Sequence, residues 1–126
     1  GKRLENVHIR IGAPRDDIMK GQSAEAIPGQ PLSGLKKMHR ELGAYLSGRD
    51  LAQMVIKSIE TENIEDENGV PFQVFFGISG NTHRFWSIDN ARQVIGYAPE
   101  DDSQIRFADE ISKVTLAAQK NYPAEQ

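Results

Sequence analysis

The side chains best suited to holding a small ligand are one arginine and two neighbouring aromatics. Arg40 lies in the basic run KKMHRE, within a loop rich in glycine and proline. Its planar guanidinium can bind a carboxylate or a phosphate through two parallel hydrogen bonds. Phe85 and Trp86 offer aromatic surface for such a ligand. Residue types alone favour a simpler interpretation, in which Arg40 is a surface charge and the aromatic pair fills a core.

Metal binding and nucleophilic catalysis have little support in the sequence. The three histidines, His8, His39 and His83, are scattered, and the chain has no cysteine. A zinc site needs several such ligands at short spacings. The chain contains no Gly-x-Ser-x-Gly motif. The acidic stretch Glu60–Glu67 is typical of a solvated turn, so we assign no metal ligand and no catalytic residue.

A nucleotide-binding loop is also weakly indicated. Gly77 and Gly80 follow an apolar run and precede a helical pattern, as in part of a dinucleotide fingerprint. However, His83 stands where that fingerprint needs a third small residue. We interpret this stretch as an ordinary strand-to-helix turn and assign no cofactor-binding residue.

Composition limits the class of protein. The chain has 126 residues, of which 38% are hydrophobic and 26% charged, and a net charge of −3. That balance suits a small folded domain and argues against nucleic acid as a partner. No apolar run approaches the roughly 20 residues of a membrane helix, and the N-terminus has no apolar signal-peptide core. We expect a cytoplasmic protein that binds neither membrane nor nucleic acid.

A strand–helix–strand unit forms the predicted scaffold. Val7–Gly12 alternates apolar and polar residues, and Phe72–Ser79 is a nearly continuous apolar run expected to be buried on both faces. Between them, Ser47–Asp50 has the pattern of a capping box, in which Asp50 reaches back to the cap's own N–H. The helix after it has one apolar face, expected to point inward: Leu51, Met54, Val55 and Ile59. This order predicts an α/β fold with two parallel strands.

The remaining segments are less regular. Ala13–Gly43 contains three prolines and is interpreted as either an ordered lid or a flexible insertion, with one or two helical turns within Leu35–Leu42. Ser87 is expected to cap a helix, Ile88–Ile95, that stops at Gly96. A last helix begins at Asp102 or Ser103, ends at Tyr122-Pro123, and carries one apolar stripe: Phe107, Ile111, Val114 and Ala118.

Three stretches of the chain resemble a known family. RIGAPRDD, RELGAYLSGRDLAQMVIKSIE and FFGISGNTHRFWSIDNARQVIGYAPEDDSQIRFADEI are similar to the C-terminal part of extended short-chain dehydrogenases, the NAD-dependent epimerase/dehydratase family, and most similar to uronate dehydrogenases. The resemblance implies the last two parallel strands of a Rossmann sheet with its crossover helix, followed by C-terminal helices on the substrate side. It also implies that Arg40 binds the carboxylate of a sugar acid and that Phe85 and Trp86 lie near the substrate.

Two features of that family are absent. The N-terminal glycine-rich nucleotide loop is missing, and so is the catalytic Tyr-x-x-x-Lys. Four residues after the three tyrosines stand Arg49, Asp101 and Gln126. The chain therefore lacks the proton donor and the cofactor-binding site that hydride transfer requires, although NAD is implied for the parent family. We therefore expect a chain that is inactive alone or, as the alternative, a free-standing module that binds a partner or a small ligand.

The predicted organisation is a single partial domain. Residues 1–12 form a strand, residues 13–44 a lid or insertion, and residues 45–126 a helix–strand–helix–helix series. Because the chain runs almost at once into an inner strand, we expect a fragment of a larger fold. One edge of Val7–Gly12 then lacks its neighbour, which favours a homo-oligomer formed by edge pairing or by exchange of Ala13–Gly43. A small sugar acid is the other expected partner.

Overall fold

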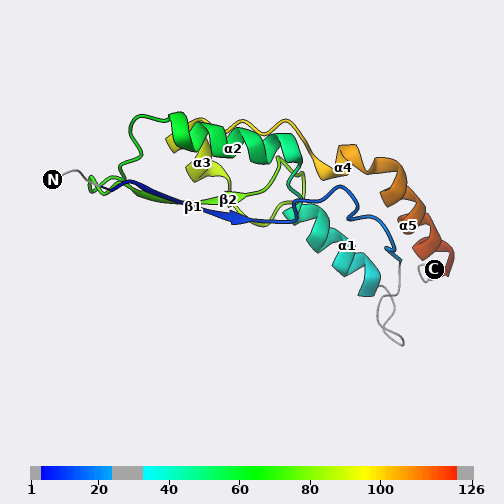
Figure 1. Ribbon diagram of the computed structural model, residues 1–126. Helices are drawn as coiled ribbons and strands as arrows, with labels where there is room; N and C mark the ends of the chain where they lie inside the picture. The colour runs from blue at the N-terminus through cyan, green and yellow to red at the C-terminus, as the bar shows by residue number, and fades with distance from the viewer. Residues whose placement is uncertain (1–3, 24–32, 122–126) are drawn as a thin grey trace.

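The chain is an α/β protein built on two parallel strands. The computed structural model describes residues 4–23 and 33–121 (Figure 1). Within these residues, the elements in chain order are β1 (Asn6–Ile11), α1 (Ser33–Ala44), α2 (Gly48–Glu60), β2 (Phe72–Gly77), α3 (Asp89–Ile95), α4 (Ser103–Arg106) and α5 (Ala108–Asn121).

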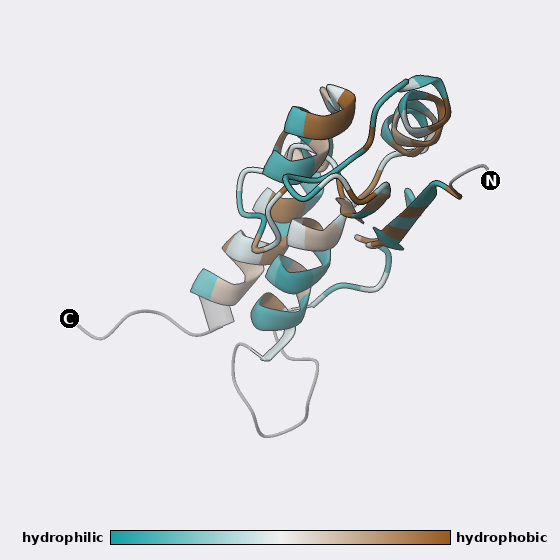
Figure 2. Cartoon of the chain, turned by 90° about the vertical axis from the view of Figure 1, so that its left-hand side faces the viewer, coloured by the Kyte–Doolittle hydropathy of each residue, from teal (hydrophilic) through white to brown (hydrophobic). Residues whose placement is uncertain are grey.

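β1 and β2 form a parallel pair joined through α2. The register runs from Asn6 opposite Phe72 to Ile11 opposite Gly77. The alternation of apolar and polar residues along β1 is visible in Figure 2. Since parallel neighbours require a crossover connection, the helix between them completes a β–α–β unit. The predicted partial Rossmann-like unit is confirmed.

One face of this sheet carries the main core. α2 and α3 lie on the same side of the strands (Figure 1). Seven buried residues from the strands, the helices and the segments beside them form the cluster: Met54, Phe75, Ile78, Ile88, Ala91, Ile95 and Tyr97. In the part of the chain that the structure describes, no helix covers the opposite face, where Phe72 remains 45% exposed. The expectation that β2 is buried on both faces is therefore wrong, because the described elements place a helical layer on one face only.

A second core lies beyond the end of the strands. α1, α4 and α5 gather there (Figure 1) around Ile18, Met38, Leu42, Tyr45 and Phe107. α1 is longer than the one or two turns expected, and residues 13–23 pack against it through Ile18, which is 1% exposed. Residues 24–32 of the predicted lid or insertion lie outside the described residues.

The predicted C-terminal helix is divided in two. Asp102 caps α4 by accepting a hydrogen bond from the Gln104 N–H at 3.0 Å, and the break at Phe107 separates α4 from α5. The expected apolar stripe is confirmed, since Phe107 and Ala118 are buried and Ile111 and Val114 are half-buried. Tyr122-Pro123 lies outside the described residues.

The start of α3 differs slightly from the prediction. Ser87 accepts a hydrogen bond from the Asp89 N–H at 3.2 Å, but Ile88 occupies the cap position. Gly96 ends the helix in the left-handed conformation with φ 68°, as expected. None of the described helices combines the length and the apolarity needed to span a membrane.

The capping box of α2 forms only in part. The Ser47 hydroxyl accepts the Asp50 N–H at 3.2 Å, as predicted. Asp50 does not reach back to the cap, because its buried carboxylate accepts the N–H groups of Glu100 at 2.7 Å and Asp101 at 3.1 Å. The Ser47 N–H donates to the Ser79 hydroxyl instead, at 3.0 Å. The hydrogen bond from the Ser47 N–H to Ser79 thus takes the place of the local bond to Asp50 that a complete capping box would contain.

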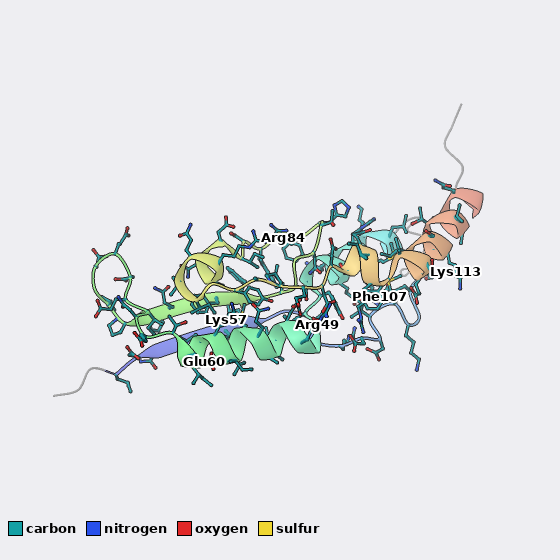
Figure 3. All side chains as sticks on the ribbon, turned by 90° about the horizontal axis from the view of Figure 1, so that it is seen from above. Arg49, Lys57, Glu60, Arg84, Phe107 and Lys113 are labelled. Carbon is teal, nitrogen blue, oxygen red and sulfur yellow. The ribbon has the colours of Figure 1, made fainter. Side chains whose placement is uncertain are left out.

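Fewer of the apolar residues of α2 are buried than their spacing predicts. Met54 is fully buried, but Val55 is 39% exposed and Ile59 is 78% exposed. On the other side of the helix, Gln53 and Lys57 hydrogen-bond to the backbone of Ala98 and Gly96 at 2.7 and 2.8 Å; Figure 3 labels Lys57 on α2. The prediction that Val55 and Ile59 point inward is wrong, since no described element covers that side.

An ion pair fixes the segment after α3 to the start of α2. Arg49 donates two hydrogen bonds to the Asp101 carboxylate, at 2.8 and 2.7 Å. These bonds, together with a hydrogen bond from Ser47, hold the pKa of Asp101 at about 2, below its usual 3.8, although partial burial acts in the opposite direction. The charged carboxylate is therefore favoured in the folded state.

We expect Asp101→Asn to lower the free energy of unfolding at pH 7. The free energy of unfolding of the variant should also fall less steeply as the pH is lowered. A carboxyl group whose pKa is depressed on folding stabilises the protein above its unfolded pKa, and that contribution disappears as the pH falls toward the folded pKa. The difference in unfolding free energy between wild type and variant should shrink between pH 4 and pH 2, as measured by urea denaturation. Glu100→Gln is the control, because Glu100 lies 3.6 Å from Arg49 and both side chains are largely exposed. A difference that is independent of pH would contradict the assignment.

Candidate functional site

A pocket opens between α1 and the loop that follows β2. It has a volume of about 580 Å³ and is lined by His39, Arg40, His83 and Phe85. The first two residues come from α1 and the last two from the segment between β2 and α3. The pocket therefore joins parts of the chain that are more than 40 residues apart in sequence.

Packing of α1 determines which of its residues reach the pocket. Met38 and Leu42, four residues apart, are buried in the second core. His39 and Arg40 are consequently exposed. The neighbouring Glu41 hydrogen-bonds to Gln22 and lies 3.8 Å from Arg15. Among residues 4–23 and 33–121, no carboxylate forms an ion pair with Arg40, so its guanidinium is available to an incoming anion.

Asn81 links the loop between β2 and α3 to the C-terminal end of α1 through hydrogen bonds. Its buried amide donates to the carbonyl oxygens of Gly43 at 3.1 Å and Tyr45 at 2.9 Å, and its side-chain oxygen accepts the Ser103 N–H at 3.1 Å. The Ser103 hydroxyl in turn donates to the Leu42 carbonyl at 2.6 Å. These bonds satisfy backbone groups of three segments at once, and they set the distance between the two walls of the pocket.

The absence of a side chain at position 43 lets the loop approach closely. A Cβ added to Gly43 would lie 2.8 Å from the His83 carbonyl oxygen and 3.2 Å from the Phe85 ring. Such contacts are tighter than normal packing allows, so any larger residue would push His83 and Phe85 away from α1. Gly43 and Asn81 therefore act together to build the site.

The pocket combines basic and apolar groups. The rings of His39 and His83 are 6.3 Å apart and nearly perpendicular, at 85°. The Phe85 ring is 55% exposed and forms an apolar wall. Arginine and histidine donate hydrogen bonds to carboxylate or phosphate oxygens, while an aromatic face can contact the C–H surface of a sugar. The arrangement suits a small anion with an apolar side.

Of the predicted site residues, Arg40 and Phe85 come together in this pocket, and Trp86 does not line it. The Trp86 ring stacks on Phe76, with centroids 5.5 Å apart and planes 15° apart, and meets Phe85 edge-on at 4.8 Å. It also packs against the main core. Trp86 thus packs against the Phe85 ring. It also lines a second, polar depression together with Arg84, which Figure 3 labels.

Sequence reasoning missed His39 and His83 as residues of one pocket. Their spacing of 44 residues carries no local signal that would place them in one pocket. Within the described residues, no three His, Cys, Asp or Glu side chains are grouped so that they could hold a metal ion. The adjacency of His39 to Arg40 was the one available clue.

The two tyrosines buried in the described part of the chain are committed to structural roles. The Tyr45 hydroxyl donates to Asp16 at 2.7 Å, and the Tyr97 hydroxyl donates to the Ile78 carbonyl at 2.8 Å. Burial is the main cause that raises the pKa of both phenols well above the usual value. Neither hydroxyl lines the pocket, so neither is placed to exchange a proton with a ligand there.

Comparison with known proteins gives one informative similarity. A stretch of 68 residues, 54% of this chain, is 34% identical to an NAD-dependent glucose-6-phosphate dehydrogenase of Haloferax volcanii. The stretch amounts to 23% of that enzyme's length, so the chain spans less than a quarter of this relative. No protein-family model matches the chain, and no solved structure matches it. The similarity supports an origin related to NAD-dependent oxidoreductases.

Proposed function

We propose that this chain is the substrate-side C-terminal portion of an NAD-dependent sugar epimerase/dehydratase-like or uronate dehydrogenase-like protein. In this proposal it is one partial domain whose pocket binds the anionic group of a sugar. The observation that carries the proposal is the Arg40 guanidinium, which no carboxylate of the described residues pairs with, in the same pocket as the exposed Phe85 ring. The partial similarity to a sugar-phosphate dehydrogenase is consistent with a ligand of this class.

Each part of the ligand has a matching group in the pocket. Arg40 would hold the carboxylate of a sugar acid or the phosphate of a sugar phosphate through paired hydrogen bonds. His39 and His83 would donate further hydrogen bonds to the anion or to hydroxyl groups. Phe85 would pack against the ring of the sugar, and Trp86 would keep Phe85 in place.

Hydride transfer is not part of the proposed activity of the isolated chain. No Tyr-x-x-x-Lys pair occurs in the sequence, and the hydroxyl groups of Tyr45 and Tyr97 donate to Asp16 and to the Ile78 carbonyl and do not line the pocket. NAD would therefore have to be held by another part of a larger protein. The alternative is a non-catalytic module that binds a small ligand or a partner with the same fold, for which the same pocket is the binding site.

Calorimetric titration tests the proposal. Glucuronate or glucose 6-phosphate should bind, whereas glucose should bind at least tenfold more weakly because it lacks the anion. Arg40→Ala should weaken binding of the anionic sugar by about 10- to 100-fold, the loss expected for a charged hydrogen-bonding group. Arg92→Ala, an exposed arginine on α3, is the matched control and should leave binding unchanged.

Three outcomes would contradict parts of the proposal. Equal binding of glucose and glucuronate would show that no anion is recognised. Unchanged affinity in Arg40→Ala would place the anion elsewhere. Heat evolved on titration with NAD alone would contradict the absence of a cofactor site.

A further inference from the structure

Basic groups are concentrated around the pocket between α1 and the loop after β2, although the whole chain has a net charge of −3. The pocket itself is lined by the guanidinium of Arg40 and the imidazoles of His39 and His83. Lys36 lies three residues before His39 and four before Arg40, so it shares their side of α1, and it is exposed. Arg84 follows His83 directly. The site therefore favours a ligand with more than one negative charge.

The acidic side chains of the surrounding elements are directed elsewhere. Glu41, on α1, hydrogen-bonds to Gln22 and lies 3.8 Å from Arg15. Asp102, which precedes α4, accepts the Thr82 N–H at 3.0 Å. Among the described residues, no carboxylate lines the pocket. The other charged groups of the adjoining segments also lie outside it: Asp16, Asp17, Lys37, Asp89, Asp101 and Arg106.

The spacing of the two imidazoles suits a phosphate better than a carboxylate. The ring centroids of His39 and His83 are 6.3 Å apart, and the ring planes are at 85°. A phosphate monoester has three terminal oxygens, and each accepts hydrogen bonds of about 2.7–2.9 Å from charged nitrogen donors. Both rings can therefore donate to different oxygens of one phosphate while Arg40 donates to the same group. A carboxylate has only two oxygens, which paired hydrogen bonds from Arg40 already occupy.

We propose that the pocket selects a sugar phosphate over a sugar acid, with His39 and His83 as the residues that determine this choice. The inference rests on the proposed function and names the class of its ligand. A phosphate ester carries a charge of about −1.5 to −2 at pH 7, whereas a carboxylate carries a single charge. Histidine changes charge between about pH 5 and pH 8, so the second charge of the phosphate favours the imidazolium form of both rings. Binding of the phosphate is accordingly accompanied by proton uptake.

Three ligands separate charge from shape in calorimetric titrations at pH 7: glucose 6-phosphate, glucose 6-sulfate and glucuronate. The sulfate ester has the same three terminal oxygens as the phosphate but a single negative charge. Glucose 6-phosphate should bind at least about tenfold more tightly than either of the other two, because its second charge is matched by the imidazoles.

Variants of the two histidines test their role in this selection. Glutamine keeps a hydrogen-bond donor but cannot be protonated. His39→Gln and His83→Gln should each weaken binding of glucose 6-phosphate by about three- to tenfold and binding of glucuronate by less than about twofold. His8→Gln is the matched control, because His8 is exposed on β1 and does not line the pocket. Circular dichroism would verify that each variant is folded.

A pH series with glucose 6-sulfate isolates the protein's own protons, because this ester stays a monoanion. Its affinity should rise by at least about threefold between about pH 8 and pH 6, as the imidazoles become charged. The double variant His39→Gln/His83→Gln should show no such rise.

The outcomes distinguish this inference from the function on which it rests. Equal affinity for all three ligands, or selection of the phosphate that persists in the double variant, would overturn the inference and leave the binding of anionic sugars intact. Failure of every anionic sugar to bind would overturn both.

Discussion

Gly12→Ala should destabilise the chain by at least about 3 kcal/mol. A Cβ at this position would lie 2.1 Å from the Ala44 carbonyl oxygen, a backbone atom that cannot rotate away. That carbonyl accepts the Ala13 N–H at 2.8 Å, and the Ala13 carbonyl accepts the Leu46 N–H at 3.0 Å. Adding the methyl group would force apart the segment that follows β1 and the segment that joins α1 to α2.

The control for this experiment is Gly48→Ala. Gly48 is exposed at the start of α2, and a Cβ there meets no heavy atom within 4 Å. Alanine at that site should leave the chain unchanged or stabilise it by about 0.4–1 kcal/mol, because it restricts the unfolded state. Urea denaturation followed by the fluorescence of Trp86, the chain's one tryptophan, measures both variants. Similar stability of the two variants would contradict the close approach at Gly12.

Asn81→Ala should cost about 2–4 kcal/mol and should also abolish ligand binding. The variant removes the partners of the Gly43 carbonyl and the Ser103 N–H, and both of these residues are buried. A buried polar group left without a partner costs about 1–3 kcal/mol. Since Asn81 joins the two walls of the pocket, its loss separates Arg40 from Phe85.

Asn90→Ala is the matched control for Asn81. Asn90 also hydrogen-bonds through its side-chain amide, to Gln73 at 3.1 Å and to the Val74 carbonyl at 3.0 Å, but it is exposed at the edge of the sheet. Its loss should cost less than about 1 kcal/mol and leave ligand binding intact. Equal losses in the two variants would show that the buried position of Asn81 has no special role.

The two strands and α2 could be predicted from the sequence because their signals are local. Alternation in β1, the apolar run of β2, and the Ser47 cap each depend on residues close together in the chain. The parallel pairing followed from the helix between the strands. Gly96 likewise stops α3 through its own backbone conformation.

Features that depend on tertiary context were missed or misjudged. Asp50 fits a capping box by sequence, but its carboxylate binds the backbone of a segment about 50 residues away. Val55 and Ile59 have the spacing of a buried face, yet burial requires a neighbour on that side of α2. Periodicity identifies an apolar stripe; it does not identify what covers the stripe.

The candidate pocket was predictable only in part. The family resemblance implies a substrate role for Arg40 and Phe85, and the fold places both around the same pocket. His83 reaches it because Asn81 and Gly43 bring its loop against α1, and this depends on contacts between distant segments. No sequence pattern separates Trp86, which packs behind Phe85, from a residue that faces the ligand.

The most direct test of the proposed function is a titration of the isotope-labelled chain with glucuronate, followed by the backbone amide resonances. We expect the largest shifts at the residues that line the pocket: His39, Arg40, His83 and Phe85. Those shifts should be absent with glucose and in the Arg40→Ala variant. Shifts confined to other surfaces, or no saturable shift at all, would contradict the claim that this pocket binds an anionic sugar.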